Sequence, residues 1–281
     1  MRRQRVDYDG AVHHVMNRGV NRQRVFFGDA DRVQFGELLA EIHDRFEVET
    51  LAYCLMDNHY HLLLRTPSAG LAAAMQHLGG VYTRRTNNRI GRDGPLFRGR
   101  YHSIHVTTDA YLTMAARYIH RNPLERTDVS SAADYRWSSY RTYLGLRATP
   151  GFVTTEPVLG LYGNDHRALA LHTEDGHESC SDQWTVADVD QLIAFEIARH
   201  DVRYGDDQAP RLLDRTFLVL LAEADINTPL RDALHQRLAF SSATARRLAV
   251  SRAARLAASE PRIAQISDHL IHRLARRRPA A

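Results

Sequence analysis

Apolar and polar positions follow two different patterns along the first half of the chain. Four short runs read as strands, over residues 11–17, 48–56, 59–65 and 101–106. Three longer runs repeat their apolar residues every three or four positions, as helices do, over residues 29–45, 71–89 and 110–121. The order β-α-β-β-α-β-α predicts an α+β fold, a ferredoxin-like split βαβ with an antiparallel sheet.

Local signals place the ends of these elements. We expect Asp29 to cap the first helix, and residues 107–109 to cap the helix that follows the fourth strand. Asp57-Asn58 is a dipeptide that favours a turn, so the second and third strands should form a hairpin. Asn122-Pro123 should end the last helix of this region, because proline cannot continue it.

The sequence divides into three parts. Residues 5–145 hold the predicted catalytic domain, and residues 146–185, which are rich in Gly, Thr, Asp and Pro, read as an irregular connection. Residues 186–281 read as an all-helical C-terminal region, with helices at 186–200, 211–225, 229–238, 242–259 and after Pro261. That region is either a small DNA-binding unit of helix-turn-helix type or an oligomerisation or capping element, and the sequence leaves the choice open.

Composition narrows the class of protein. The chain has 281 residues, of which 44% are hydrophobic and 25% charged, as in soluble globular proteins. No apolar run has the roughly 18 residues of a membrane span, and no apolar stretch follows the basic N-terminus. Only Cys54 and Cys180 occur, which suits a reducing compartment. We therefore expect a cytoplasmic protein without a membrane partner.

Positive charge is clustered. All 37 basic residues are arginine, a bias that genome composition explains as well as function does. Residues 82–126 hold nine arginines and three acids, and residues 240–281 hold nine arginines and two acids. Two basic stretches in a chain whose net charge is only +4 indicate a polyanionic partner.

Two histidines and a tyrosine could carry chemistry. His59 and His61 lie two residues apart in a strand, so both side chains point to one face and can grip one metal ion. On the last helix, Tyr118 and Asn122 are neighbours at i and i+4. Asn122 would be the third ligand of the metal ion, and Tyr118 would be a nucleophile. Taken singly, such histidines are more often structural and such a tyrosine more often core, and Tyr111 on the same stripe is a rival nucleophile.

Four separated motifs then occur in order. They are Met56-Asp-Asn-His-Tyr-His-Leu-Leu63, Gly94-Pro-Leu-Phe-Arg-Gly-Arg-Tyr101, Ala116-Arg-Tyr-Ile-His-Arg-Asn-Pro123 and Tyr135-Arg-Trp-Ser-Ser-Tyr140. Together they resemble the HUH single-tyrosine transposases, and most closely the branch of REP-associated tyrosine transposases. The resemblance covers residues 5–145.

The resemblance implies a mechanism. His59, His61 and Asn122 fall on metal ligands for Mg²⁺ or Mn²⁺, and Tyr118 falls on the nucleophile. The enzyme would cut single-stranded DNA at hairpin or repeat sequences, form a 5′-phosphotyrosine and transfer the strand. Relatives include dimers, so a homodimer is possible. The expected DNA-binding residues are Arg84, Arg85, Arg89, Arg98, Arg100, Tyr101, Arg117 and Arg121.

Two other functions fit the same element order. A non-catalytic nucleic-acid-binding protein would need exposed aromatic side chains on the sheet face that holds His59 and His61. A metal-dependent hydrolase that uses water would form no covalent protein–DNA adduct.

Overall fold

The computed structural model describes residues 7–125, 127, 129–174, 185–199, 209–226 and 228–274. The chain forms two compact units, one with the described residues up to Glu174 and one with those from Thr185 onward. We describe each unit by itself.

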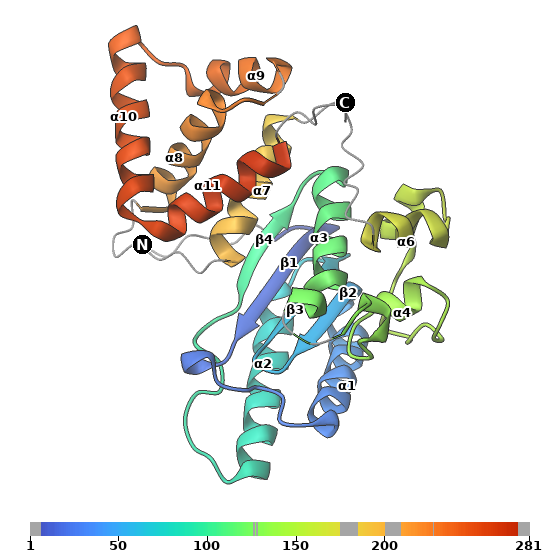
Figure 1. Cartoon of the computed structure of the whole chain (residues 1–281). Helices are drawn as coiled ribbons and strands as arrows, with labels where there is room; N and C mark the ends of the chain where they lie inside the picture. Colours follow the sequence, from blue (N-terminus) through green and yellow to red (C-terminus); the bar gives the residue numbers. More distant parts are fainter. Residues whose placement is uncertain are drawn as a thin grey trace. The chain divides into compact units, whose positions relative to one another are not determined.

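The first unit is built on a four-stranded antiparallel sheet (Figure 1). Its strands are β1 (Ala11–Arg18), β2 (Glu49–Met56), β3 (His59–Thr66) and β4 (His102–Val106). They lie in the order β2-β3-β1-β4, which is the order of a split βαβ fold. The predicted fold class and the β2–β3 hairpin are confirmed.

Helices cover both faces of this sheet. On one face α1 (Asp29–Phe46) packs beside α2 (Leu71–Ile90), and on the other face α3 (Asp109–Arg121) contacts β2 and β3. The side chains between the sheet and the α1–α2 pair form the main core. Phe35 from α1 is fully buried there, with ring centroids 5.0 Å from Tyr60 and 5.1 Å from Tyr82.

The start of α1 differs from the prediction. Gly28, not Asp29, is the N-cap residue, and the acidic residue that serves the helix start is Asp31. Its carboxylate accepts hydrogen bonds from the backbone N–H groups of Phe27 (2.7 Å) and Gly28 (3.0 Å). Asp31 is 2% exposed and also pairs with Arg89, so one buried carboxylate fixes the helix start and ties it to α2.

The segment after α3 protects the edge of the sheet. Residues 137–139 run beside β2, where Leu55 donates to Trp137 (2.9 Å) and Ser139 donates to Tyr53 (2.9 Å) through backbone groups. The short helix α4 (Tyr140–Tyr143) follows. An edge strand covered in this way cannot pair with another chain. The fourth motif of the sequence is therefore structural at these positions.

The prediction of an irregular connection over 146–185 is wrong for much of its length. It contains α5 (Glu156–Leu159), a 3-10 turn (Gly160–Tyr162) and α6 (His166–Glu174), and Val158, Leu159 and Leu169 are buried. Helices this short have too few turns to produce a periodic signal, and packing against the rest of the unit stabilises them. Residues 175–184 lie outside the described part of the chain.

The second unit is helical, as predicted. It contains α7 (Val186–Arg199), α8 (Ala209–Glu223), α9 (Thr228–Leu238), α10 (Ala243–Ser259) and α11 (Pro261–Leu274). Its interior is made by apolar residues of α7, α8, α9 and α11, such as Phe195, Phe217, Leu234 and Ile266. Among the described residues of the whole chain, no helix is long and apolar enough to cross a membrane.

Replacing Phe35 tests the main core. Phe35→Ala removes a fully buried ring that contacts Tyr60 and Tyr82, so we expect the free energy of unfolding to fall by about 3–5 kcal/mol. Val33 lies on the same helix but is 51% exposed, and Val33→Ala should change stability by no more than about 0.5 kcal/mol. Urea denaturation measures both, and equal losses in the two variants would contradict this packing.

Candidate active site

Strand β3 separates the candidate metal ligands from the core. His59 and His61 point toward α3, while Tyr60 and Leu62 are buried in the core on the α1–α2 side. The imidazole ring centroids of His59 and His61 are 5.1 Å apart. His61 is 4% exposed and His59 is half-buried, so the site opens at His59.

Helix α3 brings Tyr118 and Asn122 over these histidines. The ring centroids of Tyr118 and His61 are 5.1 Å apart, with the planes at 87°. The Asn122 side chain donates from Nδ2 to the Tyr118 hydroxyl (3.0 Å), and its Oδ1 lies 3.0 Å from His59 Nε2. Tyr118 is 9% exposed and Asn122 1%. The four residues predicted from the sequence thus form one cluster.

A chain of hydrogen bonds orients the His59 ring. Asn58 donates from Nδ2 to the backbone oxygen of Arg22 (3.1 Å), so its Oδ1 is the atom left to face His59. That Oδ1 is 2.7 Å from His59 Nδ1 and can only accept, so Nδ1 carries a proton. In the neutral ring the lone pair is therefore on Nε2, the atom that faces Asn122.

The donor set fits a divalent metal ion. His59 Nε2 and Asn122 Oδ1 lie 3.0 Å apart, and in the neutral imidazole both atoms carry lone pairs that a cation between them can bind. Two ligands bound at about 2.1 Å and at right angles, as around Mg²⁺, are separated by about 3 Å. Within the described residues, no group of three or more His, Cys, Asp or Glu side chains could hold a metal ion. The cluster here has only two such residues, because its third candidate ligand, Asn122, is an amide.

His14 on β1 supports His61 from behind. His14 Nε2 is 3.2 Å from His61 Nδ1, and the two rings are 5.4 Å apart. Burial lowers the pKa of His14 to about 3, with the positive charge of His102 as a smaller cause. His14 is therefore neutral at physiological pH.

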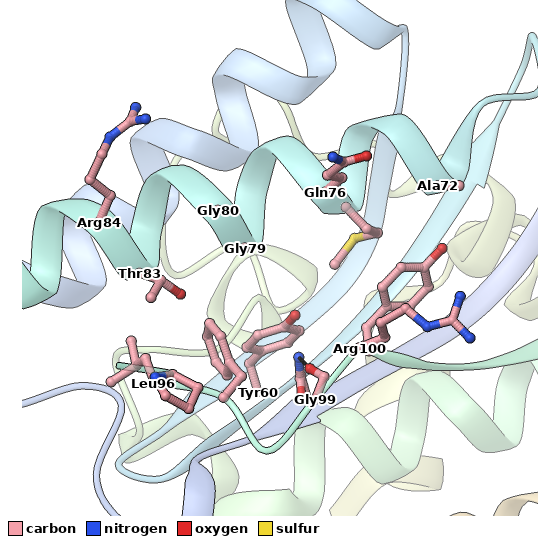
Figure 2. A pocket seen from close by; sticks show the side chains of 15 residues that line it. Tyr60, Ala72, Gln76, Gly79, Gly80, Thr83, Arg84, Leu96, Gly99 and Arg100 are labelled. Atoms are coloured by element: carbon pink, nitrogen blue, oxygen red, sulfur yellow. Dashed lines mark hydrogen bonds between the residues drawn. The ribbon is translucent and has the colours of Figure 1, made fainter. Parts of the chain in front are cut away.

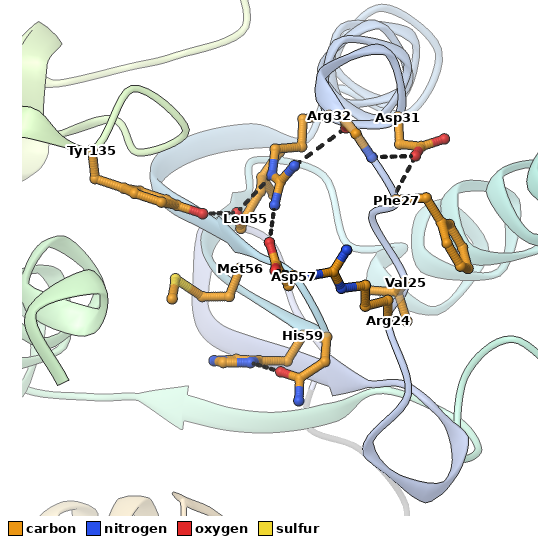
Figure 3. A network of polar contacts seen from close by, with 12 residues as sticks. Arg24, Val25, Phe27, Asp31, Arg32, Leu55, Met56, Asp57, His59 and Tyr135 are labelled. Carbon is orange, nitrogen blue, oxygen red and sulfur yellow. Dashed lines mark hydrogen bonds and ion pairs between the residues drawn. The ribbon is translucent and has the colours of Figure 1, made fainter. Parts of the chain in front are cut away.

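A second polar network holds the turn that precedes His59 (Figure 3). Arg32 of α1 is 7% exposed, pairs with the Asp57 carboxylate and donates to the Leu55 carbonyl (3.3 Å). The Asp57 carbonyl accepts from the backbone N–H groups of Val25 (2.8 Å) and Phe26 (2.9 Å). The turn is thus fixed on both sides, and the position of His59 follows from it.

Sequence reasoning missed these supporting residues. Asn58 and Asp57 were assigned only to a turn, and Arg32 and His14 had no assigned partner. The one available signal was the position of Asn58 directly before His59. The other partners are distant in sequence, 25 positions for Arg32 and Asp57 and 47 for His14 and His61, and a local pattern cannot reveal them.

Tyr111 lies away from the cluster. It precedes Tyr118 by seven residues on α3, which is about 10 Å along the helix axis. Its backbone N–H donates to the capping hydroxyl of Thr108 (3.1 Å). The rings of His61 and His14 pack against Tyr118 instead, so geometry favours Tyr118.

The seven arginines among the predicted DNA-binding residues separate into two groups. Exposed side chains belong to Arg84, Arg85, Arg98 and Arg100. Arg117 donates to the His172 carbonyl (2.7 Å), and Arg121 donates to the carbonyls of Thr173 (2.6 Å) and Glu174 (2.7 Å), so both bind the end of α6. Arg89 pairs with Asp31. These three guanidinium groups stabilise the fold.

A cavity of about 630 Å³ lies between α2 and the loop that precedes β4 (Figure 2). Tyr60, Phe97 and Tyr101 contribute its aromatic lining, and Arg84 and Arg100 are its charged side chains. Tyr101 is 8% exposed and lines this cavity rather than the surface. Tyr60 also turns away from His59, so the cavity is on the α2 side of the sheet, opposite the histidine cluster.

The two histidines of β4 do not form a pair of ligands. His105 faces His13 across the sheet, with ring centroids 5.6 Å apart, and its Nε2 lies 2.9 Å from the Tyr8 hydroxyl. His102 pairs in register with Met16 and is exposed. His102 and His105 are three residues apart on one strand, so their side chains point to opposite faces of the sheet.

Comparisons with known proteins find one family whose model is similar to part of the first unit. Residues 8–122 match the family model described as "Transposase IS200 like". No curated protein matches the chain. A structure of the REP-associated tyrosine transposase bound to a REP hairpin is similar, with 13% identity and a TM-score of 0.45 over 55% of this chain and 90% of that one. A transposase-like protein from Deinococcus radiodurans R1 has 18% identity and a TM-score of 0.31 over 46% of this chain and 100% of that one.

Replacing Asn58 tests whether it orients His59. Asn58→Ala removes the acceptor for His59 Nδ1, so we expect affinity for Mn²⁺, measured by titration calorimetry, to fall about 10-fold or more. Asn58→Asp keeps an acceptor and should retain most of the affinity. Asn88→Ala, on the exposed surface of α2, is the control and should have no effect. Unchanged Mn²⁺ affinity in a folded Asn58→Ala protein would contradict the assignment.

Proposed function

Because residues 8–122 match the model of the IS200-like transposase family, we propose that this protein cleaves and rejoins single-stranded DNA through a covalent bond to Tyr118. The observation that carries the proposal is the contact of the Tyr118 hydroxyl with Asn122, whose other amide atom faces His59. One phenol is thereby held beside two imidazoles and one amide. This is the set of groups that a tyrosine nucleophile and its electrophile require.

The proposed reaction is a phosphoryl transfer. The Tyr118 oxygen attacks the phosphorus of a DNA phosphodiester and loses its proton, while the bond from phosphorus to the 3′-oxygen breaks and that oxygen gains a proton. The products are a 5′-phosphotyrosine and a free 3′-hydroxyl. A 3′-hydroxyl from another strand reverses the step, so strands are exchanged without an external energy source.

His59, His61 and Asn122 are the residues proposed to hold Mg²⁺ or Mn²⁺. The metal would supply positive charge to the scissile phosphate and offset the negative charge that grows there. Asn58 keeps the lone pair of His59 on Nε2, and His14 packs behind His61. Asn122 Nδ2 holds the Tyr118 oxygen in place by donating to it. His14 lies on β1, Asn58 lies in the β2–β3 turn, and the other residues lie on β3 and at the end of α3.

The proposed substrate is single-stranded or hairpin DNA. Arg84, Arg85, Arg98 and Arg100 are exposed, and arginine suits phosphates because its fork binds two oxygens at once. Hairpin or repeat sequences are the form of substrate that the resemblance of the four motifs implies. Arg89, Arg117 and Arg121 are left out of the proposed surface because they hold other parts of the fold.

The sheet face weighs against a purely nucleic-acid-binding function. Among the described strands β1–β4, the face that holds His59 and His61 carries no Phe, Tyr or Trp side chain. It is covered by α3, and His61 is 4% exposed. A binding sheet of the RNA-recognition type stacks bases on exposed aromatic rings. This face does not offer them.

Replacing the nucleophile tests the proposal. Wild-type protein incubated with end-labelled hairpin DNA and Mn²⁺ should give an adduct that survives denaturation and gel electrophoresis. Tyr118→Phe should abolish it, because phenylalanine lacks the attacking oxygen. Tyr111→Phe is the matched control and should retain it, since Tyr111 is about 10 Å away along α3.

Two outcomes would sink the proposal. One is an adduct that persists in Tyr118→Phe and disappears in Tyr111→Phe. The other is cleavage by the wild-type protein without any adduct, which would identify water as the nucleophile.

A further inference from the structure

Helix α10 of the second unit is exposed along almost its whole length. It has 17 residues, Ala243–Ser259, and Ala253 is its one buried residue. By contrast, α11 buries Ile263, Ile266 and Leu270. A helix that contributes so little to its own core has most of its surface available to a partner.

The inner side of α10 is firmly attached. It packs on α8, and Arg246 binds the Glu223 carboxylate of α8 through both Nε (3.1 Å) and Nη2 (2.9 Å). Ser242 caps the helix start by accepting from the Ala245 N–H (3.1 Å). The exposed side of α10 is therefore presented by a rigid element.

The outer side carries positive charge and short polar groups. Opposite Ala253 on the helix wheel lie Thr244, Leu248, Ser251 and Arg255, at spacings of four, three and four residues. All four side chains are exposed. Exposed Arg247 and Arg252 flank this stripe, one on each side. From Ala243 to Ser259 there is no Asp or Glu, so nothing on the helix neutralises the arginines.

Helix α9, the short turn after it and α10 have the arrangement of a helix-turn-helix. Helix α9 packs on α8 and buries Leu230, Leu234 and Leu238. Four residues, 239–242, then join α9 to α10, and Ala239 has φ 41°, the left-handed conformation of a sharp turn. Two helices joined by so short a turn, with the second helix exposed, form the arrangement that places a recognition helix in the major groove.

The chemistry of the outer side favours duplex DNA over other polyanions. Single strands are bound by aromatic rings that stack on bases, and α10 has no aromatic residue. A membrane surface needs a broad apolar face, whereas Leu248 is the one large apolar side chain among the six described outer positions. Short hydroxyls and arginines, together with one aliphatic group for a thymine methyl, are what base edges and phosphates bind.

We propose that α10 is a recognition helix for double-stranded DNA, with Arg247 and Arg252 on the phosphates and Thr244, Ser251 and Arg255 toward the base edges. This site is separate from Tyr118 and does not depend on the proposed strand transfer. It would give the chain a second DNA-binding surface with a different preference from the first.

Fluorescence anisotropy of the full chain tests the proposal, with a random-sequence 24-base-pair duplex pool as the probe. Arg247→Ala/Arg252→Ala should weaken duplex binding at least about tenfold and reduce the slope of log affinity against log salt by about two. Ser251→Glu, which puts a negative charge on the stripe, should weaken it similarly. Arg215→Ala/Arg237→Ala is the matched control, because Arg215 lies over Phe240 and Arg237 pairs with Asp190.

The same variants are measured on a 30-nucleotide poly-dT strand, where affinity should be nearly unchanged. Circular dichroism checks that each variant is folded. Duplex affinity equal to wild type in the α10 double variant would overturn the proposal. So would an equal loss on poly-dT, because α10 would then be a general polyanion surface. Tyr118→Phe should bind the duplex normally, so failure of the strand-transfer proposal is detected separately.

Discussion

One chain of hydrogen bonds runs from the β2–β3 turn to the helix that covers the sheet. His59 Nδ1 donates to Asn58 Oδ1, His59 Nε2 lies 3.0 Å from Asn122 Oδ1, and Asn122 Nδ2 donates to the Tyr118 hydroxyl. Each link sets the next, because an amide that donates at one end must accept at the other. The positions of the candidate ligands and the nucleophile are therefore a single constraint.

Strand β3 connects this chain of hydrogen bonds to the hydrophobic core. Side chains of β3 alternate, so the residue between the two histidines, Tyr60, is buried against Phe35 and Phe97. A shift of β3 by one residue would expose the core and bury the wrong groups. Arg32 and Asp57 prevent that shift at the turn. Stability of the core and geometry of the site are thus maintained by the same register.

Much of this arrangement follows from local sequence patterns. The strand and helix periods predicted the element order, and the spacings of His59 with His61 and of Tyr118 with Asn122 predicted which side chains meet. Patterns did not predict α5 and α6, because helices this short do not produce a clear periodic pattern of apolar residues. They also did not separate Arg117 and Arg121, which bind α6, from the exposed arginines. Those outcomes depend on contacts between distant residues.

The most direct measurement is peptide mapping of the covalent adduct by mass spectrometry. Trypsin cuts after Arg100, Arg117 and Arg121, so Tyr111 and Tyr118 fall in different peptides. The account predicts that the nucleotide mass is attached to the peptide of residues 118–121. Attachment to the peptide of residues 101–117, or to any other part of the chain, would contradict it.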